Sequence, residues 1–175
     1  DTSAPVITLT GSSSITIEQG TDFGDPGWGA TDNVDDVLTV SVDGTVNSDL
    51  VGEYTITYST SDSAGNSSSV TRTVTVVDTT APIITLNGAA EINHSFGELY
   101  TDAGATATDS NDGEITVTSS GTVDADSAGT YTITYTATDA AGNSVTLNRT
   151  VNVPAVNSSD NSVVQVLDDG LAGSL

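Results

Sequence analysis

The chain has 175 residues, of which 24 are acidic and only two, both arginines, are basic, so its formal net charge is −22. This balance excludes nucleic acid as a partner, because phosphate binding needs a cationic surface. No stretch approaches the roughly 20 apolar residues of a membrane span, so we expect no membrane insertion. Because there is no cysteine, small domains must be held by their cores, by metal or by their neighbours.

Short runs of Thr, Val, Ile and Tyr that alternate with polar residues indicate β-strands in the N-terminal part of the chain. The Asp43-Gly44 pair is typical of a hairpin turn between two of them. No segment has a helical period, so the pattern predicts an all-β fold. In chain order, the predicted strands cover residues 6–10, 14–18, 27–31, 37–42, 45–47, 53–60 and 68–77.

The same strands recur at a constant offset, which takes Asp1 to Asp78 and Tyr54 to Tyr131. Such an internal repeat indicates an array of small domains. DTSAP at residues 1–5 returns as DTTAP at 78–82, GEYTITY at 52–58 returns as GTYTITY at 129–135, and DSAGN at 62–66 returns as DAAGN at 139–143. We therefore assign module 1 to residues 1–77, module 2 to residues 78–153, and a linker with a tail strand to residues 154–175.

One tyrosine in each module indicates the kind of fold. Seven short strands in one repeat fit a two-sheet β-sandwich, and Gly52-x-Tyr54-x-Ile56 places a tyrosine two residues before a core position. This is the arrangement of the tyrosine corner of immunoglobulin-like folds. We expect Tyr54 and its counterpart Tyr131 to be largely buried, with each hydroxyl bonded to a nearby backbone group.

The two arginines take core positions. On the last strand of module 1, Arg72 is in phase with Val74 and Val76. A charged group in the core needs a partner. We expect Arg72 to lie along Tyr58 and to reach a carboxylate at the end of the sheet, and Arg149 to do the same in module 2.

Acidic loops are the candidate site for chemistry. Module 1 contains DNVDD at residues 32–36, and module 2 contains DSNDGE at residues 109–114. Calcium takes roughly six to eight oxygen ligands, which closely spaced Asp, Asn and Glu can supply. The alternatives are that these residues favour turns, which we prefer for the loops at 62–66 and 139–143, or that the charge serves solubility. The candidate calcium ligands are Asp32, Asp35, Asp78, Asp109, Asn111, Asp112, Glu114 and Asp139.

The expected topology groups these loops. If strands alternate up and down, the loop at residues 32–36 lies where module 1 leads into module 2, beside Asp78 and the loop at 139–143. The loop at 109–114 then forms an equivalent site toward whatever follows. Because crowded carboxylates repel one another, a cation would stabilise this arrangement.

Taken together, these motifs resemble the bacterial immunoglobulin-like surface repeat, which is related to hyalin-type repeats. The resemblance covers residues 1–153 and rests on Asp-Thr-Thr-Ala-Pro, Ala-Thr-Asp, Gly-x-Tyr-x-Ile-x-Tyr and Asp-x-Ala-Gly-Asn. It implies a bacterial, secreted or cell-surface protein, since such modules are beads of large adhesins, biofilm proteins and secreted polysaccharide-degrading enzymes. In adhesins of this kind, calcium often rigidifies the junctions between beads.

Catalysis is not expected. The one histidine, His94, aligns with Ile17 and is not part of the repeat, whereas a nucleophilic triad needs a base placed against its nucleophile. The first hypothesis is a non-enzymatic spacer or subunit of a surface adhesin, fibre or biofilm matrix. The alternative is an accessory region of a secreted polysaccharide-degrading enzyme, either a spacer or a carbohydrate-binding module with Trp28 as its sugar platform.

The apolar tail at residues 162–175 does not restart the repeat, and two interpretations stay open. It begins a different domain, or it forms a strand that pairs with a neighbouring identical subunit. An open contact of the second kind would build a head-to-tail fibre.

Overall fold

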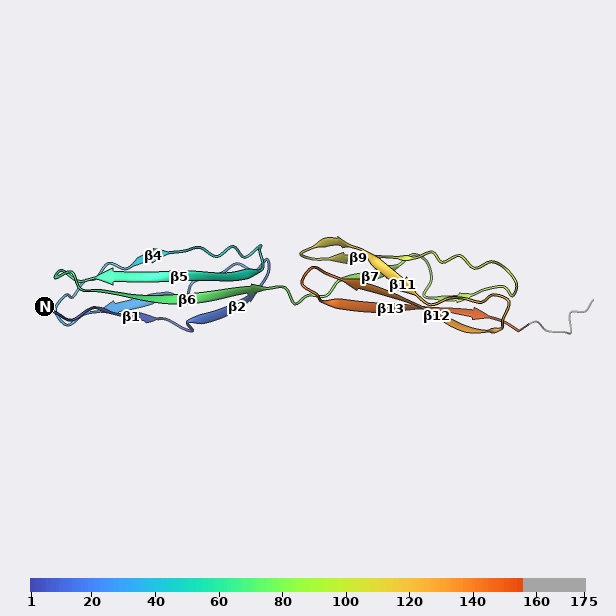
Figure 1. Ribbon diagram of the computed structural model, residues 1–175, viewed down its shortest axis with the longest axis horizontal. Coiled ribbons are helices and arrows are strands. Elements are labelled where there is room, and N and C mark those ends of the chain that lie inside the picture. The colour runs from blue at the N-terminus through green and yellow to red at the C-terminus, as the bar shows by residue number, and fades with distance from the viewer. Residues whose placement is uncertain (156–175) are drawn as a thin grey trace, which may run out of the picture. The chain divides into compact units, whose positions relative to one another are not determined.

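The computed structural model describes residues 1–155, which form thirteen β-strands and no helix. They bear out the all-β prediction (Figure 1). The chain divides into two compact units that do not coincide with the two repeats, because residues 108–115 and 138–145 group with residues 1–83. The predicted tail strand, with its proposed pairing to a neighbouring subunit, lies outside the described residues.

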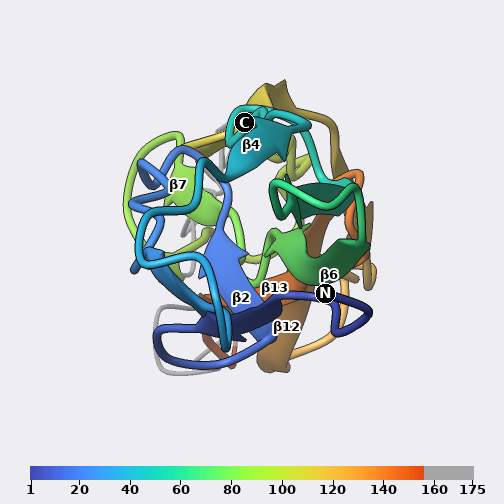
Figure 2. The same ribbon diagram turned by 90° about the vertical axis from the view of Figure 1, so that its left-hand side faces the viewer.

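Module 1 is a sandwich of a two-stranded and a four-stranded sheet. The first sheet has the order β1-β3 and the second the order β2-β6-β5-β4, so that β2 and β4 are its edges and lie apart in the end view (Figure 2). All pairs are antiparallel except β2 with β6. The strands are β1 (Val6–Leu9), β2 (Ser14–Glu18), β3 (Trp28–Thr31), β4 (Ser41–Asp43), β5 (Gly52–Ser61) and β6 (Ser67–Val77).

Module 2 repeats this plan with one strand more. Its sheets have the orders β10-β9-β7 and β11-β12-β13-β8, and β8 again runs parallel to β13. The extra strand β10 adds a third strand to the edge of the smaller sheet. The strands are β7 (Ile83–Leu86), β8 (Glu91–Asn93), β9 (Ala105–Asp109), β10 (Gly113–Ile115), β11 (Val117–Ser120), β12 (Gly129–Thr138) and β13 (Ser144–Val153).

The core of each module forms as strand alternation requires, because successive side chains point to opposite faces. In module 1, Ile56 and Tyr58 of β5 pack against Val74 of β6, and all three are buried. The intervening residues Thr55 and Thr57 lie on the outer face. In module 2 the buried hydrophobic residues are Ile84, Ala107, Ile133, Tyr135, Ala137, Val151 and Val153.

The predicted hairpin at Asp43-Gly44 is wrong. Of the two expected strands, only residues 41 and 42 are in a sheet, and with Asp43 they pair with β5 instead. Gly44 has a φ of +102°, and a Cβ added to it would lie 2.2 Å from the carbonyl oxygen of Thr55. Gly44 therefore serves a close approach of two backbone segments, which no larger residue allows.

The tyrosine corner is present in both modules. The hydroxyl of Tyr54 donates to the carbonyl oxygen of Leu50 at 2.8 Å, and that of Tyr131 donates to Ser127 at 2.7 Å. Both tyrosines are half-buried, less completely than the core residues two positions later, Ile56 and Ile133. The tyrosine that is fully buried in module 1 is Tyr58.

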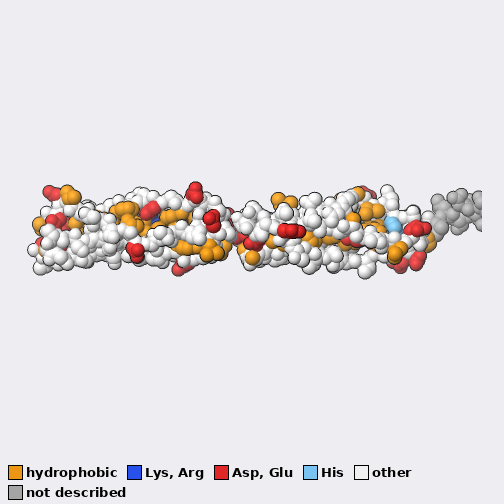
Figure 3. All heavy atoms as spheres, turned by 90° about the horizontal axis from the view of Figure 1, so that it is seen from above, with side chains coloured by type: hydrophobic (Ala, Val, Ile, Leu, Met, Phe, Trp, Pro, Cys, Tyr) orange, Lys and Arg blue, Asp and Glu red, His pale blue; other side chains and the backbone are white. Residues whose placement is uncertain are grey.

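The expectation for the arginines is confirmed. Arg72 is fully buried, and its guanidinium lies over the ring of Tyr58 and pairs with Asp25. Arg149 pairs in the same way with Asp102. The surface is consequently almost free of basic groups, as the face in Figure 3 shows, while acidic side chains are scattered over it.

Candidate metal centre

Three carboxylates meet where module 2 begins. Asp78 precedes β7, Asp109 ends β9, and Asp112 lies in the turn that leads to β10. One carboxylate oxygen of each residue lies within 4.8 Å of those of the other two. Asp78 and Asp109 are each only 8% exposed, so this negative charge is largely withdrawn from water.

Module 1 has an equivalent cluster, made of Asp1, Asp32 and Asp62. Asp1 and Asp32 are the counterparts of Asp78 and Asp109 in the repeat. Each cluster has three members, and the repeat adds the counterpart of the one member that the two do not share. We name these sets acidic site 1, which is Asp1, Asp32 and Asp62 with Asp35 as the counterpart of Asp112, and acidic site 2, which is Asp78, Asp109 and Asp112 with Asp139 as the counterpart of Asp62.

One carboxylate in each site has an oxygen without a partner. The Oδ1 atom of Asp109 accepts hydrogen bonds from the N–H groups of Asn111 and Asp112, at 2.7 and 3.2 Å. Its Oδ2 atom is buried and has no hydrogen bond, and the same holds for Oδ2 of Asp32. A buried unpaired oxygen of this kind is costly. The unpaired oxygen recurs in both modules and is therefore a feature of the repeat.

Hydrogen bonds keep the carboxylate of Asp32 ionised. The N–H groups of Val34 and Asp35 donate to its Oδ1 at 2.9 and 3.1 Å. These bonds lower the pKa of Asp32, although the negative charge of Asp62 acts in the opposite direction. The carboxylate is therefore available as a metal ligand at neutral pH.

The turn between the last two strands of each module holds the fourth aspartate. The side chain of Asn66 donates to Asp62, which lowers the pKa of that carboxyl. In module 2, burial acts to raise the pKa of Asp139, but hydrogen bonds from Asn143 outweigh it, and the net pKa is lowered. Both carboxylates are buried and ionised.

The expected grouping is confirmed for Asp78 and the loop at 139–143, since Asn143 contacts the carbonyl oxygen of Asp78 at 3.1 Å, but it is wrong for the loops at 32–36 and 109–114. Asp32 lies with Asp1 and Asp62, not with Asp78, and Asp109 lies with Asp78, where its own module begins. Up-and-down alternation fails because the chain passes from one sheet to the other between β1 and β2 without reversing. The strand β1 is antiparallel to β3, which ends next to Asp32, and β2 is parallel to β6, which starts after the Asp62 turn.

Of the predicted ligands, Asp35, Asp139 and Glu114 are not among the carboxylates that meet in the two clusters, and Glu114 is exposed on β10. Asn111 contributes its backbone N–H to Asp109. Asp1 and Asp62, which do meet Asp32, were not among the predicted ligands. The repeat contains the signal for both, since their counterparts Asp78 and Asp139 were candidates.

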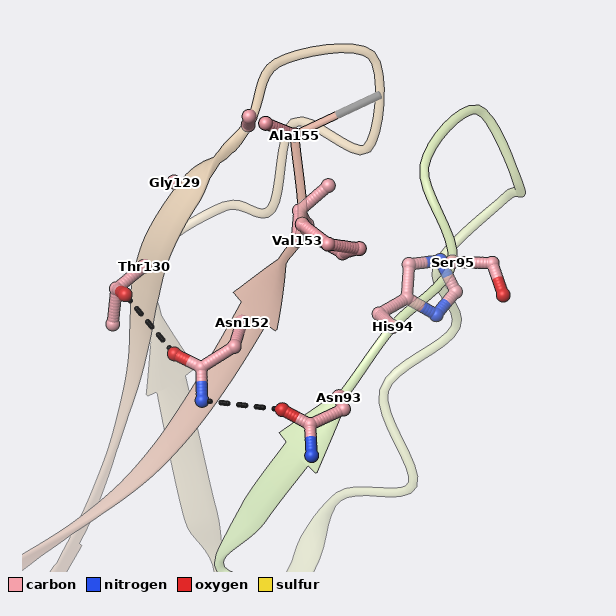
Figure 4. A pocket seen from close by; sticks show the side chains of 10 residues that line it. Asn93, His94, Ser95, Gly129, Thr130, Asn152, Val153 and Ala155 are labelled. Carbon is pink, nitrogen blue, oxygen red and sulfur yellow. Dashed lines mark hydrogen bonds between the residues drawn. The ribbon is translucent and has the colours of Figure 1, made fainter. Parts of the chain in front are cut away.

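A groove of about 780 Å³ lies beside the end of β13 and carries the one histidine (Figure 4). The Nε2 atom of His94 is 2.8 Å from the carbonyl oxygen of Glu98. Across the groove, Thr130 donates to Asn152, whose amide contacts Asn93 at 3.5 Å. The described residues that line the groove offer no nucleophile set against a base.

The family of bacterial surface protein Ig-like domains matches the sequence twice, over residues 7–76 and 84–153. The chain belongs to this family. Membership agrees with the two sandwiches, the tyrosine corners and the repeat, and it favours a non-catalytic module of a surface protein. Among the residues described, there is no helix that could span a membrane.

Solved structures with a similar course include a lipoprotein from Bacteroides thetaiotaomicron, with 16% identity, a TM-score of 0.38, and coverage of 82% of this chain and 98% of that one. The M60 catalytic domain with two CBM51 domains of Clostridium perfringens ZmpB has 14% identity and a TM-score of 0.42. The similarity covers 85% of this chain and 30% of that one. Drosophila N-cadherin EC1-4 has 15% identity and a TM-score of 0.37, with coverage of 87% of this chain and 50% of that one. No curated protein matches the sequence.

Proposed function

We propose that this chain is a non-enzymatic spacer in a secreted or cell-surface protein of a bacterium, such as an adhesin, a fibre or a matrix protein. The supporting observation is that module 1 receives the chain at one end and releases it at the other. In module 1, the amide of Asn66, in the turn before β6, lies 3.4 Å from the carbonyl oxygen of Asp1. The module ends at Val77, after the 11 residues of β6, which span about 35 Å.

A module of this kind lengthens the protein to which it belongs and adds no catalytic site of its own. Its acidic surface keeps it hydrated, and the groove at the end of module 2 has no catalytic arrangement among its described residues. Stacking such modules in series would place an attached domain at a distance set by the number of copies.

Calcium is part of this proposal. Acidic sites 1 and 2 supply closely spaced carboxylate oxygens, the donors that calcium prefers, and each contains a buried oxygen without a partner. A cation would offset the repulsion between the aspartates and would tie the first residue of the module, Asp1 or Asp78, to the later loops. Calcium should therefore raise the melting temperature, and a chelator should lower it.

The spacer role can be tested on bacterial cells. An epitope would be displayed through one, two or four copies of module 2 fused to an outer-membrane anchor. Antibody access to the epitope should rise with copy number when the cells carry a thick polysaccharide layer. Equal access for one and four copies would contradict the spacer role.

A carbohydrate-binding role is the second candidate. It is favoured by Trp28, which is 39% exposed and whose ring lies tilted against that of Tyr58 at a centroid distance of 5.1 Å. An exposed indole can stack on a sugar ring. Retention of the chain on a polysaccharide column, lost on Trp28→Ala, would favour this role, whereas equal elution of both proteins would exclude it.

A further inference from the structure

Asn143 forms hydrogen bonds both within its own turn and with the first residues of module 2. Its backbone N–H and its side-chain amide both donate to the carboxylate of Asp139, at 2.7 and 2.8 Å. The same Nδ2 atom lies 3.1 Å from the carbonyl oxygen of Asp78 and 3.2 Å from that of Thr80. A residue of the last hairpin therefore contacts the first residues of the module, more than 60 positions earlier in the sequence.

These contacts fix the segment that carries a member of acidic site 2. The N–H of Thr80 donates to Oδ1 of Asp78 at 3.1 Å, which orients the Asp78 side chain relative to its own backbone. Because Asn143 holds the two carbonyl groups on either side of this turn, it also sets the direction in which the Asp78 carboxylate points. The leading segment, residues 78–80, is thus tied to the last hairpin.

Module 1 shows the same arrangement. The backbone N–H and side-chain amide of Asn66 each lie 2.7 Å from a carboxylate oxygen of Asp62. The amide is also 3.4 Å from the carbonyl oxygen of Asp1. Because the contact occurs in both copies, it is a structural feature of the repeat.

We propose that Asn143, and Asn66 in module 1, is a positioning residue for the calcium site. It holds the leading segment so that the first aspartate completes the cluster. The inference rests on the proposed binding of calcium to the acidic sites. The side-chain amide of Asn143 has two N–H donors, which serve the Asp139 carboxylate and the backbone carbonyls. An aspartate at this position would repel all of these oxygen atoms.

Two physical effects of Asn143→Asp have opposite signs, which makes the substitution a sharp test. If only the electric field matters, an added negative charge beside the site should tighten calcium binding. If Asn143 positions Asp78, loss of its donors should weaken binding. The matched control is Ala141→Asp, which adds the same charge at an exposed position of the same turn and keeps the donors of Asn143.

The experiment measures calcium binding by titration calorimetry. The background is Asp32→Asn with Asp35→Asn, which disables acidic site 1 and leaves one site to observe. We expect Asn143→Asp to raise the calcium Kd about tenfold or more, the factor that corresponds to the loss of one charged hydrogen bond. Asn143→Ala should weaken binding in the same direction, whereas Ala141→Asp should leave it unchanged or tighter.

Equal or tighter binding by Asn143→Asp than by Ala141→Asp would overturn the positioning role. A background protein that binds no calcium would instead overturn the proposed calcium site itself. Hydrogen exchange of the Thr80 amide in EDTA supplies a second readout if Asn143→Asp folds poorly. Protection should fall in Asn143→Ala and persist in Ala141→Asp, and unchanged protection in both would also contradict the proposal.

Discussion

The guanidinium of Arg72 lies over the ring of Tyr58, with its carbon 5.7 Å from the ring centroid, and both side chains bind the carboxylate of Asp25. The remaining donors of Arg72 are also used. Its Nη2 atom donates to the carbonyl oxygen of Thr10 at 2.6 Å, and its Nε atom donates to that of Ser12 at 3.1 Å. The buried charge is thus paired and hydrogen-bonded, and it fixes the segment between β1 and β2.

The ion pair of module 2 should be needed for its stability. Asp102→Asn leaves the fully buried Arg149 without its countercharge, and we expect unfolding to become easier by about 3 kcal/mol, as for other broken buried pairs. We take the lower end of the usual range because a quarter of the Asp102 side chain is exposed. Urea unfolding of the protein measures the change.

A surface carboxylate supplies the control for this substitution. Asp126→Asn removes an exposed charge and should change the free energy of unfolding by less than about 0.5 kcal/mol. If Asp102→Asn changed it as little, the pair with Arg149 would not contribute to stability.

The buried tyrosines should make the protein sensitive to alkali. Burial, together with the hydrogen bond to Asp25 and its charge, raises the pKa of Tyr58 to about 12, and burial with Asp102 raises the pKa of Tyr135 to about 12. In the unfolded chain the pKa is about 10. The stabilising contribution is complete below pH 10 and is lost as the pH rises from about 10 to about 12, because only the unfolded state then releases the proton.

Urea unfolding at a series of pH values between 9 and 12 checks this loss. The double variant Tyr58→Phe with Tyr135→Phe should show a weaker pH dependence over that range. An ultraviolet titration of the native protein should show these two phenols ionising last. Early ionisation of both while the protein is still folded would contradict the expectation.

Replacing Asp109 by asparagine should raise the melting temperature without calcium and reduce the stabilisation that calcium gives. Asp109→Asn keeps the Oδ1 acceptor for Asn111 and Asp112 but removes the charge of the unpaired oxygen. In EDTA the variant should melt at a higher temperature than the wild-type protein, because repulsion in acidic site 2 is relieved. In calcium it should gain less than the wild type, which gains about 2.7 kcal/mol at a concentration 100 times Kd.

Calorimetric melting of the variant and the wild-type protein, in EDTA and in calcium, measures both differences. Asp126→Asn, far from the cluster in the sequence, should keep the full calcium shift. An equal calcium shift in Asp109→Asn and in the wild type would exclude Asp109 as a ligand.

The tyrosine corner should contribute a single hydrogen bond. Tyr131→Phe removes the bond to Ser127 and should lower stability by about 1 kcal/mol, which is about 4–8 °C in melting temperature for a domain of this size. Tyr131→Ala should cost more but less than the roughly 3–5 kcal/mol of a fully buried aromatic. Thermal melting of both variants, with exposed Thr132→Val as the control, measures these steps; no change for Tyr131→Phe would exclude the bond.

Strands and core could be predicted because their pattern is local. Alternation along residues 53–60 and 68–77 identifies the inward face, and the partners of the buried Arg72 follow from the cost of an unpaired charge. The path between the sheets is not local. It depends on Thr10 and Ser12, whose carbonyl groups are taken up by a side chain 60 or more residues later in the sequence.

The same distance explains what was missed at the acidic sites. The grouping of Asp32 with Asp1 follows from the direction of β2, which the pattern of residues does not contain. The role of Asn143 was hidden for a similar reason, because a turn with the sequence DAAGN explains an asparagine by local bonds alone. Its contacts to residues 78 and 80 exist only in the folded module.

The parallel pairing of β2 with β6 has a mechanical consequence. If a module is pulled by its two ends, β2 is drawn back toward the start of the module while β6 is drawn forward past Val77. The two strands then slide along their length, so the ladder that joins the five residue pairs between them is strained all at once. The corresponding pairing of β8 with β13 gives module 2 the same geometry. Each module is therefore arranged to resist tension by shear, not to open one hydrogen bond at a time.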